Sequence, residues 1–226
     1  MQPIVLLGVP GAGKGTQAKR MAQRYQIPHL STGDIFRSMA ESGSEVGIRL
    51  WHDMRQGNLV PDELVCAVVA ERIGQPDCRD GYILDGFPRT VPQAEWFINF
   101  LAGNPSPVVI FLTVGYNDLY RRLLGRRSCP KCGRIYNEFT QPPRQPGLCD
   151  LDQTPLVQRK DDEAAVVRER LSAYEHQTLP LVEFFRRHGM LLEISGGEPV
   201  DRVSARLYGA LDPQPSRERA GAGPTA

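Results

Sequence analysis

The sequence predicts an α/β fold with three layers, in which helices cover both faces of a five-stranded parallel sheet. Short apolar runs recur along the chain, and helix-like stretches separate them. Most of these runs are apolar throughout, which is typical of strands buried on both faces, and such strands usually form parallel sheets. Two segments, residues 31–60 and 126–160, break the alternation and are expected to be insertions over one face of the sheet.

The expected elements follow the apolar runs in chain order. The run PIVLLG gives the first strand, and PVVIFLTV is the most strongly apolar strand. Strands are expected at residues 3–8, 27–31, 82–86, 107–114 and 190–195. Helices are expected at residues 14–25, 33–56, 61–73, 90–102, 116–125, 161–187 and 199–210. The helical stretches end near turn signals such as GN, GQP and GNP, which set the boundaries.

The domain organisation follows from the two interruptions. The 31–60 segment is helical but weakly apolar, whereas the 126–160 segment combines prolines with a group of cysteines and has no helical period. The core domain is expected to comprise residues 1–30, 61–125 and 161–211. The last residues, 212–226, are polar and rich in Pro and Gly, a composition that is typical of disorder.

The composition narrows the class of protein. With 41% hydrophobic and 23% charged residues, it is ordinary for a soluble globular protein. Its apolar runs fall short of the roughly 20 residues of a membrane helix. PIVLLGV is too short, and lacks the basic lead-in, for a signal peptide, so a cytoplasmic protein without a membrane partner is expected. A net charge of +1 gives no general attraction to nucleic acids.

The stretch GVPGAGKGT, residues 8–16, predicts a phosphate-binding loop. Glycines let backbone N–H groups converge on a phosphate, and the N-terminus of the following helix favours the same anion. Lys14 adds a full positive charge, and Thr16 can supply a hydroxyl toward Mg²⁺. The residues expected to bind a nucleoside triphosphate are Gly11, Ala12, Gly13, Lys14, Gly15 and Thr16. The loop alone does not separate an ATPase, a GTPase and a kinase.

Two further stretches suggest a second phosphate site. LSTGDIFR, residues 30–37, places Thr32 at a helix start and Arg37 one turn into that helix. DGFPRT, residues 85–90, places Asp85 at the carboxyl end of a predicted strand, where open α/β sheets bind ligands. Arg89 follows four residues later, and two arginines from separate segments suit a phosphate. The alternative is that Asp85 simply forms a turn before Gly86.

With these motifs in view, the chain resembles the adenylate kinases from residue 1 to about 210. The resemblance rests on GVPGAGKGT, STGDIFR, LDGFPRT, GRR at residues 125–127 and RKDD at residues 159–162, with Arg170 beyond. It implies a five-stranded parallel sheet, a small insertion that binds the nucleoside monophosphate, and a mobile lid. It also implies the reaction MgATP + AMP ⇌ MgADP + ADP and a monomeric enzyme.

The resemblance implies a role for each matching residue. AMP would be bound by Thr32, Arg37, Gly57, Val60, Gly86, Arg89, Gln93, Arg159 and Arg170. The transferring phosphoryl group would be surrounded by Lys14, Arg89, Arg122, Arg126, Arg159 and Arg170, of which Arg126 and Arg159 also bind ATP. Asp85 would hold Mg²⁺ through water. Asp161 and Asp162 are expected to pair with nearby arginines or to cap the helix that follows, and the four histidines are expected to be structural or solvated.

The cysteines predict a metal site in the 126–160 segment. CPKCG places Cys129 and Cys132 two residues apart, and Cys149 and Asp152 repeat this spacing. A Cys-Cys-Cys-Asp set suits a structural Zn²⁺, and some bacterial-type adenylate kinases have a zinc-bearing lid that this set resembles. The alternatives are a disulfide with one free thiol, a metal-free lid, or Asp150 as the fourth ligand. An odd number of cysteines, grouped in this way, favours a metal in a reducing compartment.

Other functions remain as alternatives. A kinase for UMP or CMP would keep the same phosphate chemistry, but the long 126–160 segment favours the adenylate kinase branch. An ATP-dependent switch would leave Arg37 and Arg89 unexplained. A zinc-knuckle protein that binds nucleic acid conflicts with the net charge of +1.

Overall fold

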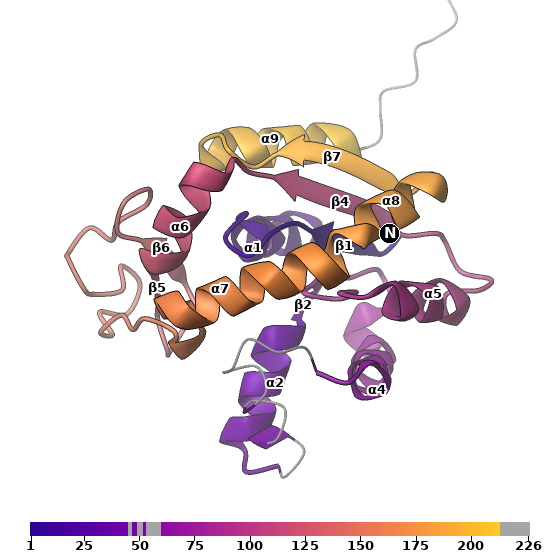
Figure 1. Ribbon diagram of the computed structural model, residues 1–226, viewed down its shortest axis with the longest axis horizontal. Helices are drawn as coiled ribbons and strands as arrows, with labels where there is room; N and C mark the ends of the chain where they lie inside the picture. The colour runs from indigo at the N-terminus through magenta and orange to yellow at the C-terminus, as the bar shows by residue number, and fades with distance from the viewer. Residues whose placement is uncertain (45–46, 49–51, 53–59, 213–226) are drawn as a thin grey trace, which may run out of the picture.

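A parallel sheet forms the centre of the molecule (Figure 1). The computed structural model describes residues 1–44, 47–48, 52 and 60–212. The strands of the sheet are β1 (Ile4–Leu7), β2 (His29–Ser31), β3 (Ile83–Asp85), β4 (Val108–Thr113) and β7 (Leu191–Ser195). They lie in the order β2-β3-β1-β4-β7, and every neighbouring pair is parallel. The predicted five-stranded parallel sheet is therefore confirmed.

The helices begin and end close to the predicted positions, with two differences. They are α1 (Lys14–Tyr25), α2 (Thr32–Glu41), α4 (Asp62–Ile73), α5 (Val91–Phe100), α6 (Tyr116–Leu124), α7 (Ala164–Ala173), α8 (Pro180–Arg187) and α9 (Val200–Leu211). The helix predicted at residues 33–56 ends at Glu41, and most of its remainder lies outside the described residues.

The helix predicted at residues 161–187 is two helices. A π-helical turn, Tyr174–Thr178, joins α7 to α8, and in it the Leu179 N–H bonds to the carbonyl of Tyr174 at 2.8 Å. Pro180 has no N–H, so the regular hydrogen-bond ladder cannot continue through it. The apolar residues keep a helical spacing on both sides of the break, so their pattern alone does not indicate it.

Both faces of the sheet are buried. Along β1, Val5 and Leu7 point into one hydrophobic cluster, while Ile4 and Leu6 point into the other. Residues of α2, α4, α5 and α8 complete the first cluster, and residues of α1, α6, α7 and α9 complete the second. This arrangement confirms the three layers, and it leaves the carboxyl ends of the strands as the edge at which ligands can bind.

The 126–160 segment forms a small β structure of its own. Its antiparallel strands are β5 (Arg126–Ser128) and β6 (Ile135–Asn137). Cys129, Tyr136 and Cys149 make a separate buried cluster with Leu156 packed against it. Such a small apolar core cannot stabilise a segment of this length by itself.

The end of the described chain lies against α1. Asp212, the first residue of the predicted disordered tail, accepts hydrogen bonds from Arg24 (2.6 Å) and from the Tyr25 hydroxyl (2.8 Å). Residues 213–226 lie outside the described residues. Among the helices that the structure describes, none is both long and apolar enough to cross a membrane.

Candidate active site

The glycine-rich loop joins the end of β1 to the start of α1, as the sequence predicts. At Gly8 a Cβ atom would lie 2.7 Å from the carbonyl oxygen of Leu112, so only glycine fits against β4. Gly13 has φ +95° and immediately precedes the helix, which begins at Lys14. The free N–H groups of the first turn of α1 therefore face the same space as the loop.

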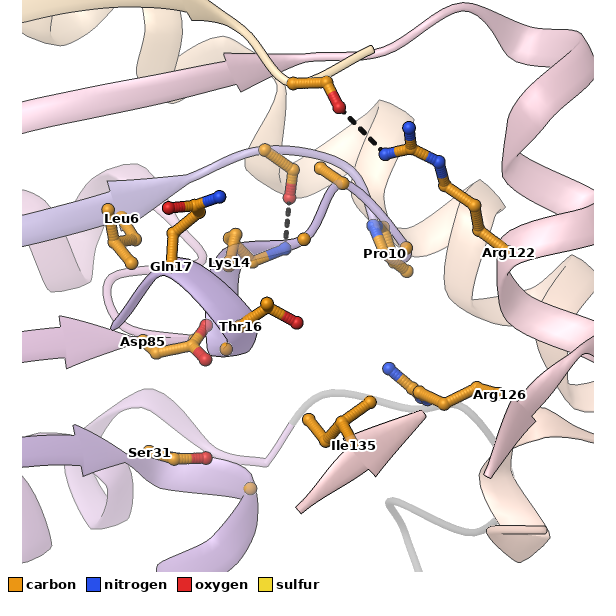
Figure 2. A pocket seen from close by; sticks show the side chains of 18 of the residues that line it. Leu6, Pro10, Lys14, Thr16, Gln17, Ser31, Asp85, Arg122, Arg126 and Ile135 are labelled. Carbon is orange, nitrogen blue, oxygen red and sulfur yellow. Dashed lines mark hydrogen bonds between the residues drawn. The ribbon is translucent and has the colours of Figure 1, made fainter. Parts of the chain in front are cut away.

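A cavity of about 580 Å³ opens over this loop. Positive side chains from segments far apart in the sequence line it: Lys14, Arg37, Arg89, Arg122, Arg126, Arg159 and Arg170. Figure 2 shows Lys14 at the loop, with Arg122 and Arg126 approaching from the other side of the cavity. So many cations around one space would repel one another strongly in the absence of anions, which makes the cavity a site for a polyanion.

Lys14 lies at the bottom of this cavity. Its ammonium group donates hydrogen bonds to the carbonyls of Gly8 (2.6 Å) and Val9 (3.1 Å). Burial lowers the pKa of Lys14 to about 8, with a further decrease from the charges of Arg89 and Arg170 and an opposing increase from Asp85. The charge of Lys14 is thus costly until an anion binds beside it.

This pKa predicts an alkaline limit to the activity. The pH profile of kcat/KM, which reports the free enzyme, is expected to fall above about pH 8 as Lys14 loses its proton. A bound polyphosphate stabilises the charged form, so the limit in the kcat profile is expected at higher pH. Burial leaves the pKa of Arg89 and Arg159 at about 10, well above that of Lys14, so the expected fall is assigned to Lys14. A flat kcat/KM profile between pH 7 and 9.5 would contradict this assignment.

Asp85 faces the phosphate loop from the end of β3. Its Oδ2 lies 3.3 Å from the position that a Cβ on Gly15 would occupy, and Figure 2 shows it near Thr16 on the first turn of α1. The Nε2 of His29 lies 3.4 Å from the same oxygen. Burial would raise the pKa of Asp85, but the contact with His29 and the charge of Lys14 outweigh it, so the pKa is below its ordinary value. A buried anion at this place suits a cation that accompanies the phosphates.

Two buried carboxylates hold the arginines of the cavity in place. Asp162 accepts from Arg126 Nε at 2.7 Å and from Arg170 Nη1 at 3.1 Å. Asp161 pairs with Arg170 at 3.0 Å. Burial opposes the charge of Arg126, but Asp162 raises the pKa of Arg126 above its usual value. The expected pairing of both aspartates with nearby arginines is therefore confirmed.

Three of the remaining arginines are held by backbone and hydroxyl groups, and the fourth is held by a carboxylate. Arg89 donates to the carbonyl of Gly86 at 2.8 Å, Arg159 to the hydroxyl of Ser128 at 2.9 Å, and Arg122 to the carbonyl of Gly196 at 2.9 Å. Burial lowers the pKa of both Arg89 and Arg159 to about 10, with neighbouring arginines adding to the effect. Arg37 pairs with Asp34 on α2.

Some of the residues assigned to AMP lie behind the cavity. Thr32, only 2% exposed, donates to the carbonyl of Gly86 at 3.0 Å. Gln93, also 2% exposed, accepts from the Arg89 N–H at 2.7 Å and donates to Asp62 at 2.6 Å. These contacts hold Gly86 and Arg89 in place, and neither side chain lines the cavity. Val60 is buried, and Gly57 lies outside the described residues.

Sequence reasoning assigned no ligand-binding role to several residues that also line the cavity, namely Lys19, His29, Asp34 and Asp161. Asp34 and Asp161 lie within the motifs STGDIFR and RKDD, so these motifs could have indicated that both residues line the cavity. His29 was expected to be structural or solvated, and only the pairing of β2 with β3 brings it beside Asp85.

The predicted metal ligands converge at one point of the 126–160 segment. The ligand atoms of Cys129, Cys132, Cys149 and Asp152 all lie within 4.8 Å of one another. The Sγ atoms of Cys132 and Cys149 are 3.5 Å apart, far longer than the roughly 2.05 Å of a disulfide bond. The disulfide alternative is therefore wrong for these cysteines. Asp150 is engaged elsewhere, because its Oδ1 accepts from the Arg144 N–H at 2.8 Å.

A phosphate loop before a helix, a carboxylate at the end of the neighbouring strand and a cationic cavity define a P-loop phosphotransferase. The comparisons with known proteins narrow this class. A family model described as adenylate kinase matches residues 6–190. The chain is 47% identical over 210 residues to an adenylate kinase of Moorella thermoacetica, a match that covers 92% of this chain and 97% of the relative.

Two further relatives support the same family. Adenylate kinases of Clostridium acetobutylicum and Finegoldia magna are 45% and 44% identical, each over 92% of this chain and 98% of the relative. The chain belongs to the adenylate kinase family. Its reaction is the reversible transfer of a phosphoryl group from MgATP to AMP, which gives two molecules of ADP. The resemblance stated from the motifs is confirmed.

Proposed function

We propose that the cavity holds MgATP on the phosphate loop and AMP beside α2, with the cations between them. The observation that supports this most directly is the convergence of Lys14 and arginines from separate segments on one space. Residues 11–16 would bind the triphosphate, with Arg126 and Arg159 above it. Arg37 and Arg89 would hold the phosphate of AMP, and Asp85 would hold Mg²⁺ through water, where the ion would offset the negative charge of the phosphates.

This arrangement is sufficient for the chemistry. The acceptor is a phosphate oxygen that is already ionised at neutral pH, so no general base is needed. The main barrier is repulsion between two polyanions, and fixed positive groups lower it most effectively when they are held in place before the reaction. The pairing of Arg126 and Arg170 with buried carboxylates provides this fixed orientation.

The proposed domain roles follow from the same contacts. Residues 31–60 would be the insertion that binds AMP, and residues 126–160 would be the lid, with the rest of 1–211 as the core. Lys19 on α1 donates to the carbonyl of Gly133, and Ile135 lies near Gly15. Contacts of this kind between the 126–160 segment and α1 support a lid that excludes water from the phosphates.

The substrate preference is tested by a coupled assay of ADP formation with ATP and each nucleoside monophosphate in turn. AMP is expected to give by far the highest kcat/KM. Equal or greater rates with UMP or CMP would favour the alternative kinase class. Formation of ADP at the ATP-only rate with every monophosphate would favour a nucleotide-dependent switch.

The cysteine cluster supports a structural Zn²⁺ in the proposed lid. In a tetrahedral zinc site with Zn–S near 2.3 Å, neighbouring sulfurs lie about 3.8 Å apart. The Sγ atoms of Cys132 and Cys149 lie 3.5 Å apart, which is close to this value. The Sγ of Cys129 also lies 3.5 Å from each carboxylate oxygen of Asp152. Three thiolates and one carboxylate are also a ligand set that zinc accepts. The ion would connect loops that also meet at the small core around Tyr136.

Removal of the metal is expected to destabilise this segment first. After chelation, with metal loss confirmed by elemental analysis, the melting temperature is expected to fall by about 4 °C or more, while ATP still binds to the phosphate loop. Cys132→Ser is expected to reproduce this change. Cys66→Ser, which alters a buried thiol of α4 outside the cluster, is expected to retain the full metal content. An unchanged melting curve after complete metal loss would contradict the structural role.

We further propose a monomeric, cytoplasmic enzyme. None of the five cysteines, all of which lie in the described part of the chain, forms a disulfide, and a reducing compartment maintains this state. Light scattering of the purified protein at several concentrations tests the oligomeric state, and a mass twice that of the 25.2 kDa chain would contradict a monomer.

A further inference from the structure

The hydroxyl of Tyr136 lies against the cysteine cluster, at 3.5 Å from the Sγ of Cys149. Tyr136 is in the middle of β6 and is 3% exposed, and Cys149 is fully buried. Because buried polar groups are normally hydrogen-bonded, the few polar atoms around this hydroxyl determine which hydrogen bonds it forms.

The other partner of the Tyr136 hydroxyl leaves the hydroxyl proton available for Cys149. The backbone N–H of Asp150 donates to the Tyr136 oxygen at 2.8 Å. Because the oxygen accepts there, its own proton is free to point toward Cys149. Arg134 lies over the Tyr136 ring, with its guanidinium carbon 5.4 Å from the ring centre, and helps to fix the ring.

The alternation of β6 connects this contact to the active site. Ile135 and Asn137, the neighbours of Tyr136, line the cavity, and Tyr136 itself contributes atoms to the lining. Ile135 Cδ1 lies 3.6 Å from the position of a Cβ on Gly15, and Asn137 donates to the carbonyl of Arg122 at 2.8 Å. Since successive side chains of a strand point to opposite faces, Tyr136 fastens the cysteine side of the strand that presents those two residues to the cavity.

We propose that Tyr136 is a positioning residue for the metal site, whose hydroxyl donates a hydrogen bond to the metal-bound thiolate of Cys149. This inference rests on the proposed metal in the lid. The hydrogen bond would stabilise the charge of the thiolate and hold Cys149 in place, as partners of metal ligands generally do. It would also make the position of β6 depend on the metal.

Tyr136→Phe removes the hydroxyl and keeps the ring, so it isolates this contact. The metal content of the wild-type protein is measured first, and Co²⁺ then replaces the native metal in the wild type and the variants. Loss of the hydrogen bond raises the energy of the sulfur electrons, so the sulfur-to-Co²⁺ charge-transfer band of Tyr136→Phe is expected at longer wavelength. Release of Zn²⁺ to a chromogenic chelator is expected to become about tenfold faster.

Two further variants complete the experiment. Tyr25→Phe removes a hydroxyl that bonds to Asp212 in another part of the protein, and it is expected to leave the band and the release rate unchanged. If Tyr136→Phe does not fold, 3-fluorotyrosine introduced at position 136 keeps the ring and makes the hydroxyl a stronger donor. Its band is expected at shorter wavelength.

The outcomes separate the inference from the proposal on which it rests. A wild-type protein that contains no metal and takes up no Co²⁺ would overturn the metal site, and this inference with it. A wild-type protein that holds the metal, with the same band position and release rate in Tyr136→Phe or with no shift for the fluorotyrosine, would overturn the role of Tyr136 alone.

Discussion

Replacement of Lys14 by methionine is expected to lower kcat by about a hundredfold to a thousandfold, the effect of removing one fixed electrostatic group from a transition state. Lys14 lies at the bottom of the cavity, fixed by the carbonyls of Gly8 and Val9. Methionine retains most of the side-chain volume but has no charge, so the packing of the loop is preserved. Steady-state kinetics with ATP and AMP measures the effect, and circular dichroism checks the fold.

The matched control is Arg187→Met, which removes a positive charge from α8. The side chain of Arg187 is 76% exposed and pairs only with Glu183 among the described ion pairs. Its kcat is expected to stay within about twofold of the wild type, because charges on the surface are screened by water and salt. A Lys14→Met protein that folds normally and keeps more than a tenth of the wild-type kcat would remove Lys14 from the proposed mechanism.

Asp162→Ala is expected to lower the free energy of unfolding by about 3 kcal/mol, because it leaves the buried Arg126 without its counter-ion. The Asp162 side chain is fully buried and accepts from both Arg126 and Arg170. Nothing else of opposite charge is equally close to Arg126 among the described ion pairs. Urea unfolding in the absence of nucleotide measures the change, and Asp162→Asn is expected to be intermediate since it keeps one acceptor oxygen.

Glu183→Ala provides the comparison for Asp162. Glu183 also pairs with two arginines, Arg186 and Arg187, but its side chain is half-exposed on the outer surface of α8. Its loss is expected to leave the unfolding midpoint almost unchanged, because water replaces the ion pairs. Equal destabilisation by the two substitutions would show that burial of the Asp162 network contributes little.

The elements of the core could be predicted from the sequence because their signals are local. The strand at residues 4–7 is an uninterrupted apolar run, and α1 begins at the lysine that the glycine motif places there. The break between α7 and α8 was not predicted, since Pro180 stands within a continuous helical pattern and Tyr174–Thr178 takes a π-helical turn before it. The spacing of apolar residues does not indicate where an α-helix changes to a π-helical turn.

The candidate site was predicted in a different way. Its arginines were identified through motifs and a resemblance to a family, because nothing local distinguishes Arg89 or Arg170 from a surface arginine. His29 beside Asp85 was missed for the same reason: the contact depends on the register of β2 with β3. The roles assigned to Thr32 and Gln93 remain predictions, although both side chains lie behind the cavity wall.

The sequence by itself determined the parallel α/β core, the glycine-rich loop before α1 and the grouping of Cys129, Cys132, Cys149 and Asp152, because each depends on residue type and short spacing. Only the tertiary structure decided which groups meet: Arg126 with Asp162, His29 with Asp85, and the Tyr136 hydroxyl with Cys149. These partners are far apart along the chain. Their pairing is set by the order of the strands and the packing of the helices. A local pattern of residues predicts neither the strand order nor the helix packing.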